Sequence, residues 1–155
     1  MNLKLLVIPF LIATAGCSTQ IEGPWRGVSL FCQGNTCPPQ SEVARAVEFF
    51  EKSSGGFFAR ETLDVYWYDD NSTFPPRTLA YTENANEVHV TNQRLLMHEL
   101  MHVKLWRNPG DPDRNHEAPG GPWTAEMNEE IRVIELALEA EQASVSECLG
   151  LPLAP

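Results

Sequence analysis

Apolar and polar positions alternate along this chain with two different periods. Apolar residues spaced three and four apart predict amphipathic helices over 41–54, 93–106 and about 125–145, and a two-residue alternation predicts strands. The expected strands cover 62–68, about 79–82 and 87–91, and the last two are close enough to form a hairpin. This order predicts an α+β domain, with a small antiparallel sheet packed on helices.

Polar residues at the helix starts support these bounds. Ser41 precedes the first predicted helix, Thr91 or Asn92 the second, and Thr124 the third. Such side chains accept hydrogen bonds from the unpaired N–H groups of a first helical turn. Glycine or proline follows the first two helices, as expected where a helix ends.

The helix predicted over 93–106 is apolar on almost every side and should therefore be buried. Within its apolar surface lie three polar side chains, His98, Glu99 and His102, in the pattern H-E-x-x-H. Histidines four apart share one side of a helix and can meet on a single metal ion. We therefore expect one zinc ion on His98 and His102, zinc-bound water as nucleophile and Glu99 as its general base.

A catalytic zinc ion usually has three protein ligands, so one more is expected. His116 is the first choice because it follows a turn-rich loop that can fold back over the motif helix. Glu126 and Glu130, beside the apolar stripe of the last helix, are the alternatives. The weaker candidates are Glu129, Asp111 and Asp113.

The strand over 87–91 runs directly into the motif helix. As an edge strand it would align an extended substrate by main-chain pairing. His89 within it is interpreted as a surface or packing residue. Four residues are open choices for stabilising an oxyanion: Tyr66, Tyr68, Tyr81 and Arg114.

Residues 87–130 resemble the zincin metallopeptidases, through His98, Glu99 and His102 with His116 in a Gly- and Asp-rich loop. The arrangement is most similar to SprT-like and related minimal zincins, in which a histidine beyond the motif helix completes the site. The metzincin branch is excluded, because its glycine and third histidine would fall on Leu105 and Asn108. The resemblance implies zinc-dependent cleavage of a protein or peptide substrate.

Residues 1–17 read as a targeting segment, with Lys4 before the apolar run 5–15. Small residues before Cys17 resemble the lipobox of bacterial lipoproteins, which implies signal-peptide removal and acyl chains such as palmitate on Cys17. The expected location is the bacterial cell envelope, with membrane attachment through this lipid anchor.

Two details qualify this location. Ser18 after the cysteine fits the periplasmic side of the outer membrane if the organism is Gram-negative. Thr14 stands where a lipobox usually has leucine, so a secreted or periplasmic protein with a plain signal peptide is the alternative.

Beyond this segment, the sequence predicts a linker and cysteine loop over 18–40 and a zincin-like domain over 41–149. The chain has a net charge of −10, and loss of Lys4 with the leader would make it −11. An acidic protein of this kind is not expected to bind nucleic acid, whose phosphates need Lys and Arg.

Cys32 and Cys37 flank a tight Gly-Asn loop and are predicted to form a disulfide, which an exported protein can keep. The alternative pairs Cys148 with one of them. Use of Cys32 and Cys37 as metal ligands is disfavoured, because no second Cys/His pair has matching spacing.

Three functions fit these observations. The first is a zinc-dependent peptidase of the envelope. The second is a non-catalytic lipoprotein in which a structural or vestigial zinc site helps to bind an envelope partner. The third is a zinc hydrolase of peptidoglycan amides. Glu99 favours an enzyme, because a structural zinc site needs no general base.

Overall fold

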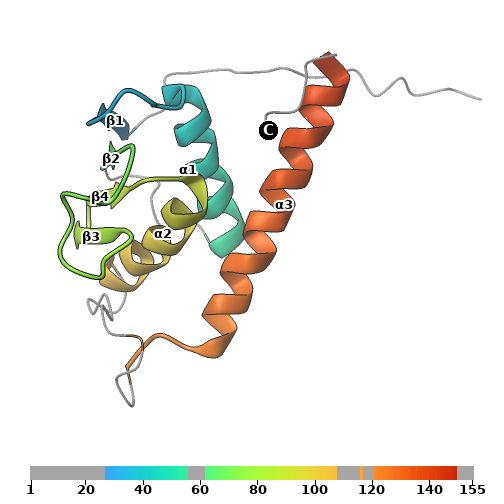
Figure 1. Cartoon of the computed structure of the whole chain (residues 1–155). Coiled ribbons are helices and arrows are strands. Elements are labelled where there is room, and N and C mark those ends of the chain that lie inside the picture. Colours follow the sequence, from blue (N-terminus) through green and yellow to red (C-terminus); the bar gives the residue numbers. More distant parts are fainter. Residues whose placement is uncertain (1–26, 56–61, 108–115, 117–120, 150–155) are drawn as a thin grey trace, which may run out of the picture.

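The computed structural model describes residues 27–55, 62–107, 116 and 121–149. Four strands form one sheet, and three helices lie on one side of it (Figure 1). This arrangement confirms the predicted α+β class. The elements, in chain order, are β1 (Val28–Cys32), α1 (Gln40–Ser54), β2 (Leu63–Trp67), β3 (Tyr81–Asn84), β4 (Glu87–Val90), α2 (Gln93–Arg107) and α3 (Ala125–Leu149).

The sheet has the order β1-β2-β4-β3 and is mixed. Strands β1, β2 and β4 run parallel, and only β3 is antiparallel to its neighbour β4. The predicted hairpin is confirmed, whereas the expectation of an antiparallel sheet is wrong. Helix α1 connects β1 to β2 and provides the crossover that a parallel pair requires.

Strand β1 lies inside the range 18–40 that was predicted to be a linker and cysteine loop. That prediction omits a strand because the apolar–polar alternation covers only Val28, Ser29 and Leu30 before Phe31 and Cys32 interrupt it. A second correction concerns β4, which was expected at an edge. Strand β4 pairs with β2 on one side and β3 on the other, so β3 is the edge strand beside it.

Helix α2 is buried, as predicted, and contacts β3, β4, α1 and α3. Its apolar residues meet those of the sheet and of the other two helices in one core. Burying each large aliphatic side chain of this kind contributes about 1.5–3 kcal/mol. Core residues from the different layers include Val47, Phe50, Val65, Val88, Val90, Leu96, Leu100, Met101, Ile134 and Leu138.

Helices α2 and α3 begin at the predicted caps. The backbone N–H of Leu95 donates to Asn92 Oδ1 at 3.0 Å, and that of Met127 donates to Thr124 Oγ1 at 3.4 Å. Each bond satisfies a donor that has no partner inside its helix.

Helix α1 differs from the prediction at its start. It begins at Gln40, after Pro39, so Ser41 is inside the helix and no side chain caps it. Proline suits this place because it has no N–H that needs a partner. Gly55 ends the helix as expected, with a left-handed φ of 105° that glycine adopts without strain.

Helix α3 is attached to α2 by an apolar stripe and by two ion pairs. Lys104 Nζ lies 2.8 Å from Glu130 Oε1, and Arg94 Nε lies 3.6 Å from Glu135 Oε2. The apolar stripe, predicted from sequence, contains the buried residues Ile131, Ile134 and Leu138. Among the described helices, none is long and apolar enough to cross a membrane.

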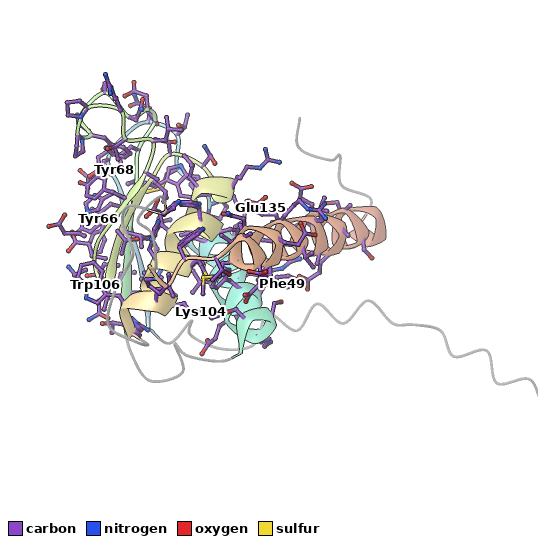
Figure 2. All side chains as sticks on the ribbon, turned by 90° about the horizontal axis from the view of Figure 1, so that it is seen from below. Phe49, Tyr66, Tyr68, Lys104, Trp106 and Glu135 are labelled. Carbon is purple, nitrogen blue, oxygen red and sulfur yellow. A yellow bond between two sulfur atoms is a disulfide. The ribbon has the colours of Figure 1, made fainter. Side chains whose placement is uncertain are left out.

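The opposite face of the sheet has a row of stacked rings, one from each strand. Phe31, Tyr66, His89 and Tyr81 follow one another with centroid spacings of 4.8, 4.7 and 4.2 Å. His89 is 7% exposed, and its Nδ1 lies 3.0 Å from the hydroxyl of Tyr68, so it is a packing residue as interpreted. Figure 2 shows Tyr66 and Tyr68 on the side away from the helices.

Candidate metal centre

Helix α2 places His98 and His102 one turn apart on the same side. Their Nε2 atoms are 3.3 Å from each other, and their ring centroids are 5.0 Å apart. His102 is 5% exposed and His98 is partly buried. The helix therefore presents two imidazole nitrogens to one point, as the motif predicted.

His116 joins this pair from the segment between α2 and α3. Its Nε2 is 2.9 Å from His102 Nε2, and the ligand atoms of the three histidines lie within 4.8 Å of one another. The structure thus brings together the three residues that were predicted to hold zinc.

The glutamates on α3 that were considered as the third metal ligand either pair with a basic side chain or are exposed. Glu130 accepts a hydrogen bond from Lys104, and Glu129 pairs with Arg132. Glu126 is exposed in the first turn of the helix. Among the described residues, the group of side chains that could share a metal ion consists of His98, His102 and His116, without any of these glutamates. The weaker candidates Asp111 and Asp113 lie outside the described residues.

The histidine group fits a metal ion on two grounds. Two ligands at ordinary Zn–N distances in a tetrahedron are separated by about 3.3 Å, which is close to the observed His98–His102 spacing. Burial, with His102 and His116 nearby, lowers the pKa of His98 to about 4, so this ring stays neutral and keeps a lone pair for a metal. Imidazole nitrogens suit Zn²⁺, Cu²⁺, Ni²⁺ and Fe²⁺.

Glu99 follows His98 on α2 and is only 4% exposed. Its Oε2 accepts a 2.8 Å hydrogen bond from the hydroxyl of Thr82 on the edge strand β3. Burial raises the pKa of Glu99 to about 7, and the bond from Thr82 opposes that rise. A carboxyl group in this range can both accept and return a proton at neutral pH.

Trp123 is a site residue that sequence reasoning missed. Its ring centroid lies 5.0, 4.5 and 4.0 Å from those of His98, His102 and His116. The available signal was its place immediately before the helix cap Thr124, where an apolar residue often packs back on the helix start. That signal predicts a packed side chain, but it does not identify the histidines as its neighbours.

The three tyrosines considered for oxyanion stabilisation do not belong to the centre. Tyr66, Tyr68 and Tyr81 stand with His89 on the outer face of the sheet, whereas α2 packs on the inner face. That part of the expectation is wrong, because a strand's alternation assigns residues to two faces without identifying which one the helix covers. Arg114 lies outside the described residues.

The predicted disulfide joins Cys32 to Cys37 at the end of β1. This bond excludes Cys148 as a partner of either residue, and it also excludes the pair as metal ligands. Cys17, which was predicted to carry the lipid, and the side chain of Cys148 lie outside the described residues.

No protein-family model, curated protein or solved structure matches this chain. The functional interpretation therefore depends on the geometry of the chain itself.

Proposed function

We propose that this protein is a zinc-dependent peptidase of the bacterial cell envelope. One observation supports the proposal above all others: the nitrogens of three histidines converge within 4.8 Å, and the helix that carries two of them also carries the buried Glu99 directly after His98. Three protein ligands leave one position of a tetrahedral metal open, which is the pattern of catalytic rather than structural zinc.

The chemistry divides between the metal and Glu99. A bound zinc ion supplies a Lewis acid that polarises the scissile carbonyl and makes water more acidic. Glu99 accepts the proton of the attacking water and then delivers it to the leaving amine. Thr82 fixes the carboxylate for this role through its 2.8 Å hydrogen bond.

The edge strand supplies a place for an extended protein or peptide substrate. Among the described strands, β3 pairs only with β4, and we propose that its other side accepts the main chain of the substrate. Thr82 belongs to this strand, and its hydroxyl reaches Glu99. A substrate aligned on β3 would therefore lie next to the element that holds the proposed base.

The envelope location is a proposal that depends on the sequence of residues 1–17, with Cys17 as the lipidated residue. Attachment through acyl chains would place the acidic domain at a membrane surface without a spanning helix.

The alternative is a non-catalytic lipoprotein with a structural or vestigial zinc site. One observation favours it: Trp123, 8% exposed, packs against all three histidine rings and so encloses part of the centre. The two functions make opposite predictions for Glu99, because a structural site needs only its ligands.

The test compares Glu99→Gln with His98→Ala, and uses Glu129→Gln, an exposed change on α3, as the matched control. Metal content is measured by elemental mass spectrometry, and cleavage is measured on a mixed peptide library. We expect Glu99→Gln to keep one zinc ion per chain and to lose about 10²–10⁴-fold in cleavage rate. His98→Ala should lose both metal and cleavage.

One result would refute the role of Glu99, and another would refute the peptidase. Cleavage by Glu99→Gln at the wild-type rate would show that Glu99 is not the general base. A wild-type protein that binds zinc but cleaves no peptide in the library would support the non-catalytic alternative instead.

A further inference from the structure

We propose that Trp123 is the positioning residue for the third metal ligand, His116, with Asn128 as its anchor. This inference depends on the metal centre of the proposed function. It explains how a ligand that is not on helix α2 is oriented toward the metal, which the H-E-x-x-H motif alone does not explain.

The helix itself fixes the spacing of the two ligands on α2. His116 is different, since it is exposed and lies between two helices. An imidazole on such a segment must have its ring plane fixed before its nitrogen can point at the metal. Metal-binding histidines usually obtain this orientation from an outer partner.

Trp123 provides that orientation by stacking. Its ring is nearly parallel to that of His116, with an angle of 4° and a centroid distance of 4.0 Å. A contact across the flat face fixes the plane of the imidazole without occupying a ring nitrogen. The Nε2 atom of His116 accordingly stays directed at His102 Nε2, 2.9 Å away.

Trp123 is itself firmly held. It is 8% exposed, belongs to the hydrophobic core, and donates a 3.1 Å hydrogen bond from Nε1 to Asn128 Oδ1. Asn128 is on the first turns of α3, which the Lys104–Glu130 pair joins to α2. A continuous series of contacts thus connects α2, which carries two of the ligands, to α3, then to the indole of Trp123, and finally to the third ligand, His116.

The indole has no acid–base role in this arrangement. Its ring does not titrate, and its single N–H group is directed to Asn128. The expected effect of changing Trp123 is therefore on metal affinity and coordination geometry rather than on proton transfer.

The experiment uses Trp123→Ala, Trp123→Phe and Asn128→Ala, with Trp67→Phe on β2 as the matched control. Zinc affinity is measured by competition with a chromophoric chelator, and coordination geometry is measured from the visible absorption of the Co²⁺-loaded protein. Circular dichroism of the metal-free protein reports folding.

Trp123→Ala should weaken zinc binding by about 10–100-fold and alter the Co²⁺ bands. Trp123→Phe keeps a flat ring and should recover most of the affinity. Asn128→Ala should lose several-fold, and Trp67→Phe should bind as the wild type does. Altered Co²⁺ bands in a Trp123→Ala variant whose circular dichroism matches that of the wild type separate positioning of His116 from a general loss of packing.

Wild-type affinity and Co²⁺ bands in a folded Trp123→Ala variant would overturn the inference and leave the peptidase proposal intact. A wild-type protein without zinc binding would refute both. If Trp123→Ala does not fold, the other two variants decide. Unchanged affinity in Asn128→Ala together with a 10-fold or greater loss in Trp123→Phe would contradict stacking as the cause.

Discussion

Thr82 Oγ1 donates a hydrogen bond to Glu99 Oε2 across 2.8 Å of the protein interior, which joins the edge strand β3 to the motif helix α2. The same hydroxyl lies 3.2 Å from the backbone oxygen of Glu99. One side chain of the strand therefore contacts both the carboxylate and the helix turn that carries it, and the carboxylate is the closer acceptor of its single proton. The consequences of removing this bond can be tested directly.

Thr82→Val keeps the shape of the side chain and removes the donor. We expect the free energy of unfolding to fall by about 1–3 kcal/mol, because a buried carboxyl oxygen loses its partner. Zinc content should not change, whereas peptide cleavage should fall roughly tenfold or more as Glu99 loses its orientation. Thr82→Ser, which retains the hydroxyl, is the control. Equal cleavage by the valine and serine variants would contradict this role.

His116→Ala should abolish tight zinc binding without changing the fold, because the side chain is exposed. Glu130→Gln is the informative comparison, since Glu130 was the competing ligand and contacts Lys104 instead. We expect this variant to bind zinc as the wild type does. Isothermal titration of both metal-free proteins with zinc checks the prediction. Weaker binding in Glu130→Gln than in His116→Ala would reverse the ligand assignment.

Asp69 should make stability depend on pH in the acidic range. Hydrogen bonds from the Thr36 side chain and from the backbone of Asn35 and Thr36 hold the pKa of Asp69 below its ordinary value of 3.8. A carboxylate with a lowered pKa stabilises the fold fully above its unfolded value, and this contribution disappears as the pH falls through the folded value.

Urea unfolding of the wild type and of Asp69→Asn between pH 2.5 and 7 measures this contribution. The difference between their midpoints should be constant above about pH 5 and should shrink below pH 3.8. A difference that does not depend on pH would show that the charge of Asp69 plays no part.

Gly34→Ala should disrupt the loop closed by Cys32 and Cys37. A Cβ atom at this position would lie 2.3 Å from Cγ of Asp69, so the carboxylate would have to move away from the backbone donors of the loop. We expect a lower melting temperature than that of the wild type, because the loop loses its hydrogen bonds to Asp69. Asn35→Ala is the control, because it keeps the backbone N–H that donates to Asp69. Equal thermal stability of the two variants would argue against this close contact.

The features that sequence predicted well are those that depend on neighbouring residues. Four-residue spacing places His98 and His102 on one side of a helix whatever surrounds it. The cap residues Asn92 and Thr124 act on the turns that follow them. His116 was also predicted, since a zinc site with two helical ligands needs another nearby.

The features that sequence did not predict depend on partners distant in the chain. Thr82 meets Glu99 across 17 residues, and nothing local to either residue specifies that contact. Strand β1 lacks the alternation that reveals a half-buried strand, so only its pairing with β2 identifies it. Parallel pairing itself is decided by how α1 crosses between the two strands, which a pattern of apolar residues does not record.

The row of rings across the outer face of the sheet also limits what that face can bind. Phe31, Tyr66, His89 and Tyr81 are nearly parallel to their neighbours, so most ring faces are covered by the next ring and the ring edges point outward. Sugars and planar bases bind aromatic residues through exposed ring faces. They would find such a face mainly on Phe31, which is at the end of the row and 40% exposed. The remainder of this surface offers ring edges and few exposed ring faces for such ligands.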